Sequence, residues 1–224
     1  MPTSNNCRFN TLILDLDGPL LEGKLRHYQC YADILQEQGY QPVPINHYWD
    51  MKRKRLDRRV QLQQSDAESI YELFLREWLA RIEQCSYLSL DSLQPQVIPI
   101  LKAWQAQGLR LVLATLRNHP DNLYWQLEQL GLRPFFAEII PVGSLEQTRT
   151  KATAVAAYLN GRSVRDCLWI GDTEIDVEAA RSLGMAVATV SCGLRTEEYL
   201  SSLQPDFVCA DLEAVVAIPA LTGS

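Results

Sequence analysis

Six short apolar runs, separated mostly by helical patterns, constrain the fold of this chain more than any other feature. The runs are nearly continuous rather than alternating, which indicates strands buried on both faces, as in a parallel sheet covered by helices. We expect strands at 9–15, 110–115, 137–142, 167–171, 186–190 and 206–209. Between them we expect helices at 96–107, 122–130, 151–159 and 174–183, with a glycine at or near the end of each. This alternation predicts an α/β fold with a doubly wound, Rossmann-like parallel sheet.

The alternation is interrupted once, between the first strand and residue 96. The gap is far longer than the median of ~4–6 residues for an ordinary connection. Its pattern is helical: Ser65-Asp66-Ala67-Glu68 is predicted to be a capping box, opening a helix with the apolar stripe Ile70, Leu73, Phe74, Trp78 and Ile82. We therefore expect a small all-helical cap domain at 22–92, inserted into a core made of 1–21 and 93–224.

Composition and charge argue against several classes of protein. Hydrophobic residues make up 47% of the 224 positions, which favours a folded core over disorder. No stretch approaches the ~18 consecutive apolar residues of a membrane span, and the polar N-terminus lacks the apolar run of a signal peptide. Scattered cysteines indicate a reducing, cytoplasmic location. The net charge of -6 makes nucleic acid or an anionic membrane an unexpected partner.

One segment departs from this acidic average. Residues 52–59 carry a local charge of +5, so the remainder of the chain sums to -11. The cations are Lys52, Arg53, Lys54, Arg55, Arg58 and Arg59. The pattern is typical of a solvated helix face, but contact with an anionic substrate or with nucleic acid remains open.

Acidic residues follow two of the predicted strands. Asp15 and Asp17 end the first strand with the same side-chain direction, and Asp172 follows the strand at 167–171, with Asp176 in the first turn of the next helix. Carboxylates from two strand ends meet at the carboxyl edge of a parallel sheet, where such folds bind ligands. Hard oxygen ligands of this kind suit Mg²⁺. The alternatives are turn chemistry at Asp15 and Asp17 and a helix-dipole role for Asp176.

Two further residues are expected near that edge. Thr115 ends the second strand, where its hydroxyl could bind a phosphoryl oxygen, although β-propensity alone would also explain a threonine there. Lys151 is predicted to start a helix after Thr150, a position where a cation is unfavourable unless a phosphate or carboxylates compensate it. A free surface lysine is the alternative.

Together these motifs resemble the haloacid dehalogenase superfamily, specifically its magnesium-dependent phosphatase branch with a helical cap after the first motif, which includes phosphoglycolate phosphatase-like and beta-phosphoglucomutase-like proteins. The resemblance runs from about Asn10 to about Asp211. It rests on LILDLDGPL, VLATLRN, the isolated Lys151 and WIGDTEIDVEAARSLG, in this order. It implies a phosphoric monoester hydrolase that works through an aspartyl-phosphate intermediate.

The resemblance also implies residue roles. Asp15 would be the nucleophile and Asp17 the general acid/base, while the Leu16 amide, Thr115 and Lys151 would bind the phosphoryl group. A developing negative charge on that group needs such fixed cations and amides.

The same resemblance implies a Mg²⁺ site. Asp15, the main-chain carbonyl of Asp17 and Asp172 would be its ligands, with Asp176 contributing directly or through water.

Three positions depart from the family pattern. Pro19 stands where Thr or Val is usual, and it removes a backbone donor. Arg117 and Asn118 replace a common Asn-Lys pair and are candidates for substrate contact. Ala152 replaces a frequent Pro after the motif lysine, which leaves Arg149 as an alternative to Lys151.

The helical insertion would be the only lid, because about 35 residues between Thr115 and Lys151 leave no room for another. Lids of this kind close over small substrates, which favours a small phosphorylated metabolite. Arg53 and Arg55 are further candidates for substrate contact. Rival interpretations are a phosphomutase on the same core, a phosphonate hydrolase using a lid lysine, and a non-catalytic or nucleic-acid-binding protein that uses residues 52–59.

Overall fold

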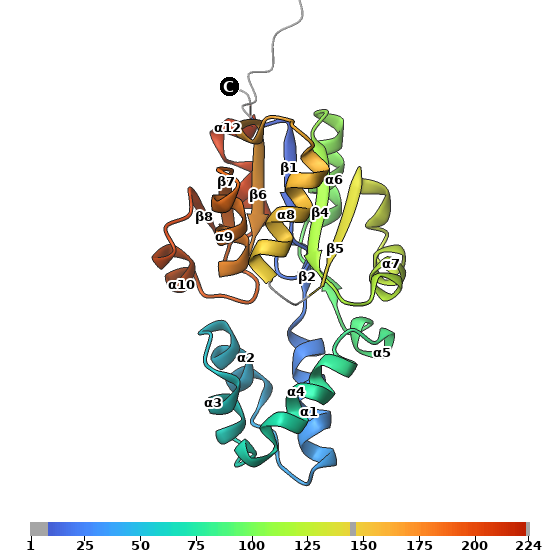
Figure 1. Cartoon of the computed structure of the whole chain (residues 1–224), viewed down its shortest axis with the longest axis vertical. Coiled ribbons are helices and arrows are strands. Elements are labelled where there is room, and N and C mark those ends of the chain that lie inside the picture. The colour runs from blue at the N-terminus through green and yellow to red at the C-terminus, as the bar shows by residue number, and fades with distance from the viewer. Residues whose placement is uncertain (1–8, 144–146, 223–224) are drawn as a thin grey trace, which may run out of the picture.

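A computed structural model describes residues 9–143 and 147–222 (Figure 1). In the described part of the chain, the main sheet has the strand order β5-β4-β1-β6-β7-β8, and all neighbouring strands are parallel. The strands are β1 (Thr11–Leu14), β4 (Arg110–Leu116), β5 (Glu138–Val142), β6 (Cys167–Gly171), β7 (Ala186–Val190) and β8 (Phe207–Cys209). Each falls on a predicted run, and the expected doubly wound α/β fold is confirmed.

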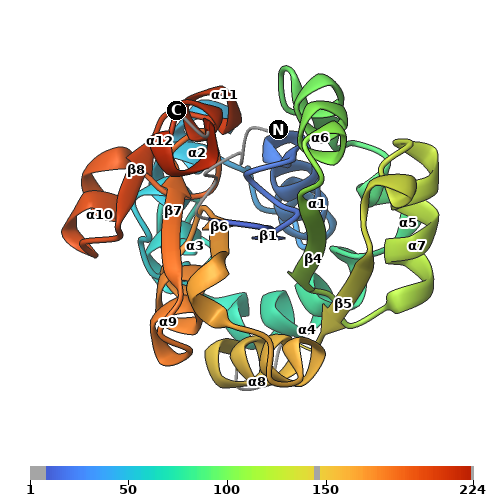
Figure 2. The ribbon, with the colours of Figure 1, turned by 90° about the horizontal axis from the view of Figure 1, so that it is seen from above.

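Helices cover both faces of this sheet (Figure 2). One face carries α6 (Val97–Ala106), α7 (Pro120–Gln129) and α11 (Leu212–Val216), and the other carries α8 (Gln147–Leu159) and α9 (Glu174–Ser182). The short helices α10 (Glu197–Ser202) and α12 (Pro219–Thr222) lie in the C-terminal part. This arrangement explains the continuous apolar runs, because alternate residues of each strand face different helices.

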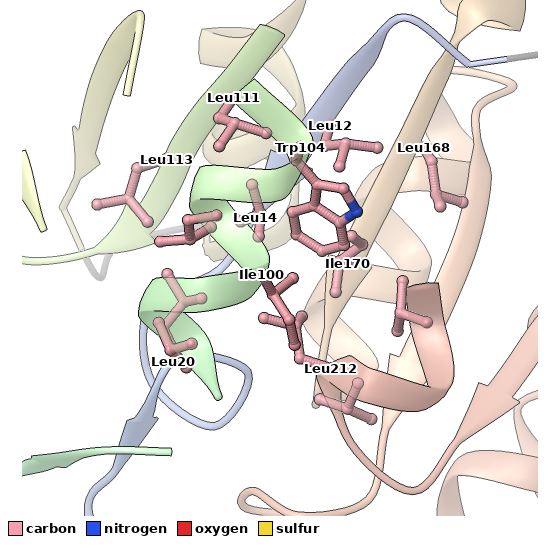
Figure 3. Close-up of a cluster of buried hydrophobic side chains, with 14 of the residues drawn as sticks. Leu12, Leu14, Leu20, Ile100, Trp104, Leu111, Leu113, Leu168, Ile170 and Leu212 are labelled. Carbon is pink, nitrogen blue, oxygen red and sulfur yellow. The ribbon is translucent and has the colours of Figure 1, made fainter. Parts of the chain in front are cut away.

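The strand β1 illustrates the two-sided burial. Leu12 and Leu14 pack with Trp104 of α6 on one face (Figure 3), while Ile13 packs with α8 and α9 on the other. All three strand residues are fully buried. The central strand is therefore fixed from both sides, and so is the loop that follows it.

The segment between β1 and α6 is helical and lies beyond the carboxyl edge of the sheet (Figure 1). It contains α1 (Lys24–Glu37), α2 (Ile45–Arg53), α3 (Arg58–Gln63), the 3-10 helix η1 (Glu68–Ile70), α4 (Tyr71–Arg81) and α5 (Cys85–Leu88). An antiparallel pair, β2 (Leu21–Glu22) with β3 (Ser92–Leu93), joins its two ends. We call residues 24–88 the helical insertion. It has an apolar cluster of its own, and its division from the core at 22–92 stays a prediction.

Two local predictions are wrong. Ser65 does not cap a helix, because its hydroxyl pairs with the Tyr31 hydroxyl (2.6 Å) and accepts a hydrogen bond from the Val43 amide (3.1 Å). The stripe on α4 is nevertheless present, with Phe74 and Trp78 buried. Helix α8 begins at Gln147, so Lys151 lies inside it rather than at its start. No Gly or Pro separates residues 147–150 from the rest of that helix.

No helix in the described ranges is long and apolar enough to cross a membrane.

Candidate active site

The two acidic strand ends predicted from the sequence meet at one edge of the sheet. Strands β1 and β6 are hydrogen-bonded neighbours, with Leu14 level with Ile170, so Asp15 and Asp172 follow adjacent strand ends. Asp176 lies one turn into α9. One carboxylate oxygen from each of these three aspartates lies within 4.8 Å of the others. Such a cluster of hard oxygen ligands could hold a metal ion.

Glycines allow the loops around Asp172 and Asp176 to pack closely. Gly18 has φ +95°, and a Cβ atom there would lie 2.1 Å from Asp172 Oδ2. A Cβ atom at Gly193 would lie 2.0 Å from the same oxygen, and one at Gly171 would lie 2.2 Å from Asp176 Cγ. Any larger residue at these positions would displace a carboxylate, so the sequence at the edge is constrained by space as well as by chemistry.

Lys151 lies between two of the aspartates. Its Nζ is 3.2 Å from Asp15 Oδ1 and 2.7 Å from Asp176 Oδ1, and the residue is 1% exposed. Burial alone would lower the pKa of this lysine, but the Asp15 and Asp176 carboxylates outweigh burial and hold its pKa above the ordinary value. Lys151 is therefore a fixed positive charge beside Asp15, as the sequence predicted. The side chain of Arg149, the alternative, lies outside the described residues.

The Asp176 carboxylate holds Lys151 and the start of α9 in place through hydrogen bonds. Its Oδ1 accepts hydrogen bonds from Lys151 Nζ and from Trp169 Nε1 (3.1 Å). Its Oδ2 accepts from the amide (3.2 Å) and hydroxyl (2.8 Å) of Thr173, which forms a capping box at the start of α9. Both oxygens are thus occupied by protein donors. This geometry favours the helix-start role and the positioning of Lys151, while direct metal ligation by Asp176 stays a prediction.

Asp172 provides the observation that fits a metal ion best. It is fully buried, and its Oδ2 accepts a hydrogen bond from the Leu194 amide, while Oδ1 has no hydrogen-bond partner. Burial, together with the Asp15 and Asp176 carboxylates, raises its pKa well above the ordinary value. Burial likewise raises the pKa of Asp15 to about 6, although Lys151 opposes the shift. A bound cation would satisfy the free oxygen and restore both groups to their ionised form.

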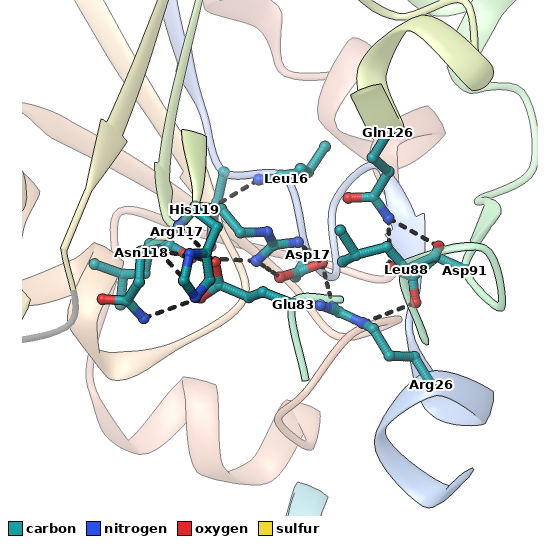
Figure 4. A network of polar contacts seen from close by, with 12 residues as sticks. Leu16, Asp17, Arg26, Glu83, Leu88, Asp91, Arg117, Asn118, His119 and Gln126 are labelled. Atoms are coloured by element: carbon teal, nitrogen blue, oxygen red, sulfur yellow. Dashed lines mark hydrogen bonds and ion pairs between the residues drawn. The ribbon is translucent and has the colours of Figure 1, made fainter. Parts of the chain in front are cut away.

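Asp17 is held in a different environment (Figure 4). Both of its oxygens accept hydrogen bonds from the Arg117 guanidinium, one of them at 2.9 Å from Nη2, and Arg26 Nη2 donates to Oδ1 at 2.7 Å. Burial would raise the pKa of Asp17, but Arg117 and Arg26 together hold it well below the ordinary value. In this arrangement Asp17 is ionised and paired.

The pairing of Asp17 extends into residues that sequence reasoning missed. Arg26 is 1% exposed and also donates from Nε to Asp91 Oδ1 at 3.0 Å, and Gln126 Nε2 donates to the other Asp91 oxygen at 2.8 Å. Arg26 lies in the first turn of α1, and Asp91 follows α5, the last helix of the insertion. A single arginine among helix residues gives no sequence signal for the contact with Asp91, which lies 65 positions away.

The remaining predicted residues divide between the site and other contacts. The Leu16 amide donates to Asp15 Oδ1 at 2.8 Å, and Thr115 is buried near the carboxyl end of β4, beside β1. Asn118 is hydrogen-bonded to the insertion, because its amide and its side chain both donate to the Glu83 carboxylate. The same carboxylate also accepts a hydrogen bond from the His119 amide. Whether Arg117 and Asn118 contact substrate stays a prediction.

Arg53 and Arg55 bind the core of the protein. Arg53 Nη2 donates to the carbonyl oxygens of Ser191 (2.5 Å) and Arg195 (3.2 Å). Arg55 Nε lies 2.9 Å from Glu174 Oε1. In this arrangement both guanidinium groups attach the insertion to the core, so a role in substrate contact, which stays a prediction for both, would compete with these bonds.

A small pocket lies between the two parts. Asp17 and Gly18 line it from the core, and His27 and Trp49 line it from the insertion.

Comparison with known proteins agrees with this geometry. Residues 9–184 match the model of the haloacid dehalogenase-like hydrolase family. Phosphoglycolate phosphatase from Aliivibrio fischeri is 26% identical over 220 residues, which covers 92% of this chain and 95% of that protein. Pyrophosphatase PpaX from Bacillus pumilus is 22% identical over 228 residues, covering 96% and 98%. A haloacid dehalogenase-like hydrolase from Streptococcus pneumoniae superposes with a TM-score of 0.73 at 20% identity, covering 93% and 97%.

The family match spans most of the chain and includes the residues that supply Asp15, Lys151 and Asp172. The resemblance and the enzyme class expected from the sequence are both confirmed. The chain belongs to the haloacid dehalogenase-like hydrolases.

Proposed function

We propose that this hydrolase cleaves small phosphomonoesters in a Mg²⁺-dependent reaction that passes through an aspartyl-phosphate on Asp15. The observation that carries the proposal is the position of Asp15. It lies beside the fixed cation Lys151 and within the acidic cluster whose Asp172 oxygen has no hydrogen-bond partner. The similarity to phosphoglycolate phosphatase and to a pyrophosphatase supports small phosphorylated substrates.

In the first step an Asp15 oxygen attacks phosphorus, and the bond from phosphorus to the leaving oxygen breaks. Lys151 offsets charge on the transferring group, since it stays positive between two carboxylates. The Leu16 amide donates to Asp15 here, and it would be one of the backbone donors available to the phosphoryl oxygens. A Mg²⁺ held by Asp15, the Asp17 carbonyl and Asp172 would supply further charge neutralisation.

In the second step Asp17 takes a proton from the water that hydrolyses the aspartyl-phosphate. The ionised form of Asp17, held by Arg117 and Arg26, is the form suited to this role. Donating a proton to the leaving oxygen in the first step requires the opposite form. We therefore infer that the Asp17 carboxylate leaves at least one of the two arginines during the cycle.

The test is hydrolysis of a panel of small phosphate compounds, including 2-phosphoglycolate and pyrophosphate, with Mg²⁺ and with excess EDTA. Release of inorganic phosphate with Mg²⁺ and its loss in EDTA are expected. Release without any sugar acceptor also distinguishes a hydrolase from a phosphomutase. Undiminished turnover in EDTA would contradict the proposed metal dependence.

A further inference from the structure

Trp169 brings a polar donor into an apolar cluster of the core. It lies in β6 on the face of the sheet that α8 and α9 cover, where it packs with residues such as Ile13 and Val177, and it is fully buried. A buried indole N–H usually finds a hydrogen-bond partner. Here that partner is the Asp176 carboxylate, whose Oδ1 lies 3.1 Å from Trp169 Nε1. A core side chain thus reaches the charged edge of the sheet.

The Asp176 carboxylate has its hydrogen-bonding capacity filled by protein donors. An ionised carboxylate offers about four lone-pair sites, two on each oxygen. Thr173 takes both sites of Oδ2, with its amide at 3.2 Å and its hydroxyl at 2.8 Å. Lys151 Nζ, at 2.7 Å, and Trp169 Nε1 share Oδ1. Lys151 can consequently bond to this oxygen from one side only, because the indole N–H holds the other.

Lys151 needs such a restraint because its ammonium group lies between two carboxylates. Nζ is nearer to Asp176 Oδ1, at 2.7 Å, than to Asp15 Oδ1, at 3.2 Å. A lysine has a flexible four-carbon stem, so a free site on Asp176 would let the ammonium group turn further from Asp15. The ring of Trp169 also limits this movement, since its centroid lies 5.7 Å from Nζ. Both the N–H and the ring therefore keep Lys151 directed at Asp15.

We propose that Trp169 is a positioning residue for the reaction at Asp15, and that it acts through Asp176 and Lys151. An ammonium group has three hydrogens, and with one directed at Asp176 and one at Asp15 the third is left for a phosphoryl oxygen. The catalytic consequence rests on the proposed function, whereas the hydrogen-bonded chain from Trp169 through Asp176 to Lys151 can be tested without it. The alternative is that Trp169 only fills the core.

The first test is kinetic and uses Mg²⁺ with the phosphate compound that the wild-type protein hydrolyses fastest. Trp169→Phe removes the N–H together with part of the ring. Trp104→Phe is the matched control, because Trp104 is 1% exposed and packs with Leu12 and Leu14 on the opposite face of the sheet (Figure 3). Trp169→Phe is also combined with Lys151→Met, where no ammonium group is left to be positioned.

We expect kcat to fall by roughly 10-fold in Trp169→Phe while KM changes less, because the charge that Lys151 offsets is largest in the transition state. Trp104→Phe should lose stability without this loss of kcat. Combined with Lys151→Met, Trp169→Phe should lower kcat no further. Equal falls of kcat in the two tryptophan variants, or the same fall with and without Lys151, would mean that Trp169 only fills the core and would overturn the inference.

The second test needs neither metal nor substrate. Labelling with ¹⁵N gives each tryptophan one indole N–H signal in NMR spectra of the metal-free protein. In Lys151→Met, Asp176 Oδ1 accepts from the indole without a competing ammonium group, so the Trp169 hydrogen bond should strengthen and its proton signal should move to lower field. The Trp104 signal should stay in place. Lys151→Gln, which keeps an uncharged donor, serves if Lys151→Met does not fold, and should move the Trp169 signal in the same direction.

These two tests keep a failure of the inference distinct from a failure of the proposed function. If the wild-type protein hydrolyses no phosphate compound, the proposed function fails, and the indole signals then decide the inference. A shift of the Trp169 signal to lower field beside an unmoved Trp104 signal supports it. A Trp169 signal that stays in place or moves to higher field overturns it.

Discussion

The carboxyl edge of the sheet and the helical insertion differ in how their charged side chains are held. At the sheet edge three aspartates form a cluster, and Lys151 lies between two of them, Asp15 and Asp176. Glycines in the surrounding loops leave no room for a Cβ atom beside Asp172 and Asp176. On the insertion Lys52 and Arg58 lie over the ring of Trp78 and pair with no acidic side chain among the described residues. The packing of the edge thus agrees with the proposed site for a metal ion and a phosphoryl group, whereas the cations of the insertion are placed by side-chain packing.

The largest expected effect is at the sheet edge. Asp15→Asn removes the charge of the proposed nucleophile and should lower phosphatase activity by at least about 10⁴-fold. Circular dichroism should show an unchanged fold. Asp121→Asn, an exposed acid in the first turn of α7, is the matched control and should keep wild-type activity.

A second change removes the proposed metal ligand. Asp172→Asn should raise the Mg²⁺ concentration needed for half-maximal activity by roughly 10- to 100-fold, since few protein ligands hold the ion. A Mg²⁺ titration of activity measures this shift. A variant that needs no more Mg²⁺ than the wild type would remove Asp172 from the metal site.

The same substitution at two glycines tests how closely the sheet edge and the insertion are packed. Gly18 and Gly39 both have positive φ, +95° and +81°, but only a Cβ at Gly18 would meet another atom, Asp172 Oδ2 at 2.1 Å. Gly39→Ala should therefore cost about 1 kcal/mol of unfolding free energy, from the backbone alone. Gly18→Ala should cost more, roughly 2–4 kcal/mol, and should also impair Mg²⁺-dependent activity. Urea unfolding and activity assays of both variants test this, and equal costs would contradict the close packing at Asp172.

The charge of the edge also predicts a pH effect on stability. Because the pKa of Asp15 is raised to about 6 in the metal-free protein, the folded state binds a proton more tightly than the unfolded state. Metal-free stability should therefore fall as pH rises from about 4 through 6, by roughly 1–3 kcal/mol for this group. Mg²⁺ keeps the carboxylate ionised, so the increase in Tm caused by Mg²⁺ should grow between pH 5 and pH 7. An increase in Tm that shrinks over this range would argue against a metal at Asp15.

The smallest expected effect concerns how the insertion is attached. Arg53→Met removes two hydrogen bonds to carbonyl oxygens of the core and should cost about 1 kcal/mol, whereas Lys54→Met should cost almost nothing. Hydrogen exchange of the Thr196 amide, which donates to the Arg53 carbonyl at 3.4 Å, should become faster only in the first variant. Equal exchange in both would mean that the Arg53 side chain does not hold this contact.

The acidic residues of the sheet edge could be predicted from the sequence because each directly follows its own strand in the chain. Asp15 and Asp172 each follow a short apolar run that favours a buried strand, and the parallel pairing of these strands brings the two aspartates to one edge of the sheet. The insertion was recognised by its length and helical period, but its contacts were not. Asp91, one of the two acidic partners of Arg26, lies 65 positions away from it, and Ser65 bonds to Tyr31 rather than capping a helix. Which cations of 52–59 face the core, the solvent or Trp78 depends on how the helices pack, and that information is not carried by a run of like charges.

The central claim is that Asp15 becomes phosphorylated, and acid quenching during turnover tests it most directly. Wild-type enzyme with Mg²⁺ and its best substrate is quenched, reduced with borohydride to convert an acyl phosphate to the alcohol, and mapped by mass spectrometry. The account predicts reduction at Asp15 alone, present only when both Mg²⁺ and substrate were added. Sustained phosphate release with an unmodified Asp15, or with the modification on another carboxylate, would contradict it.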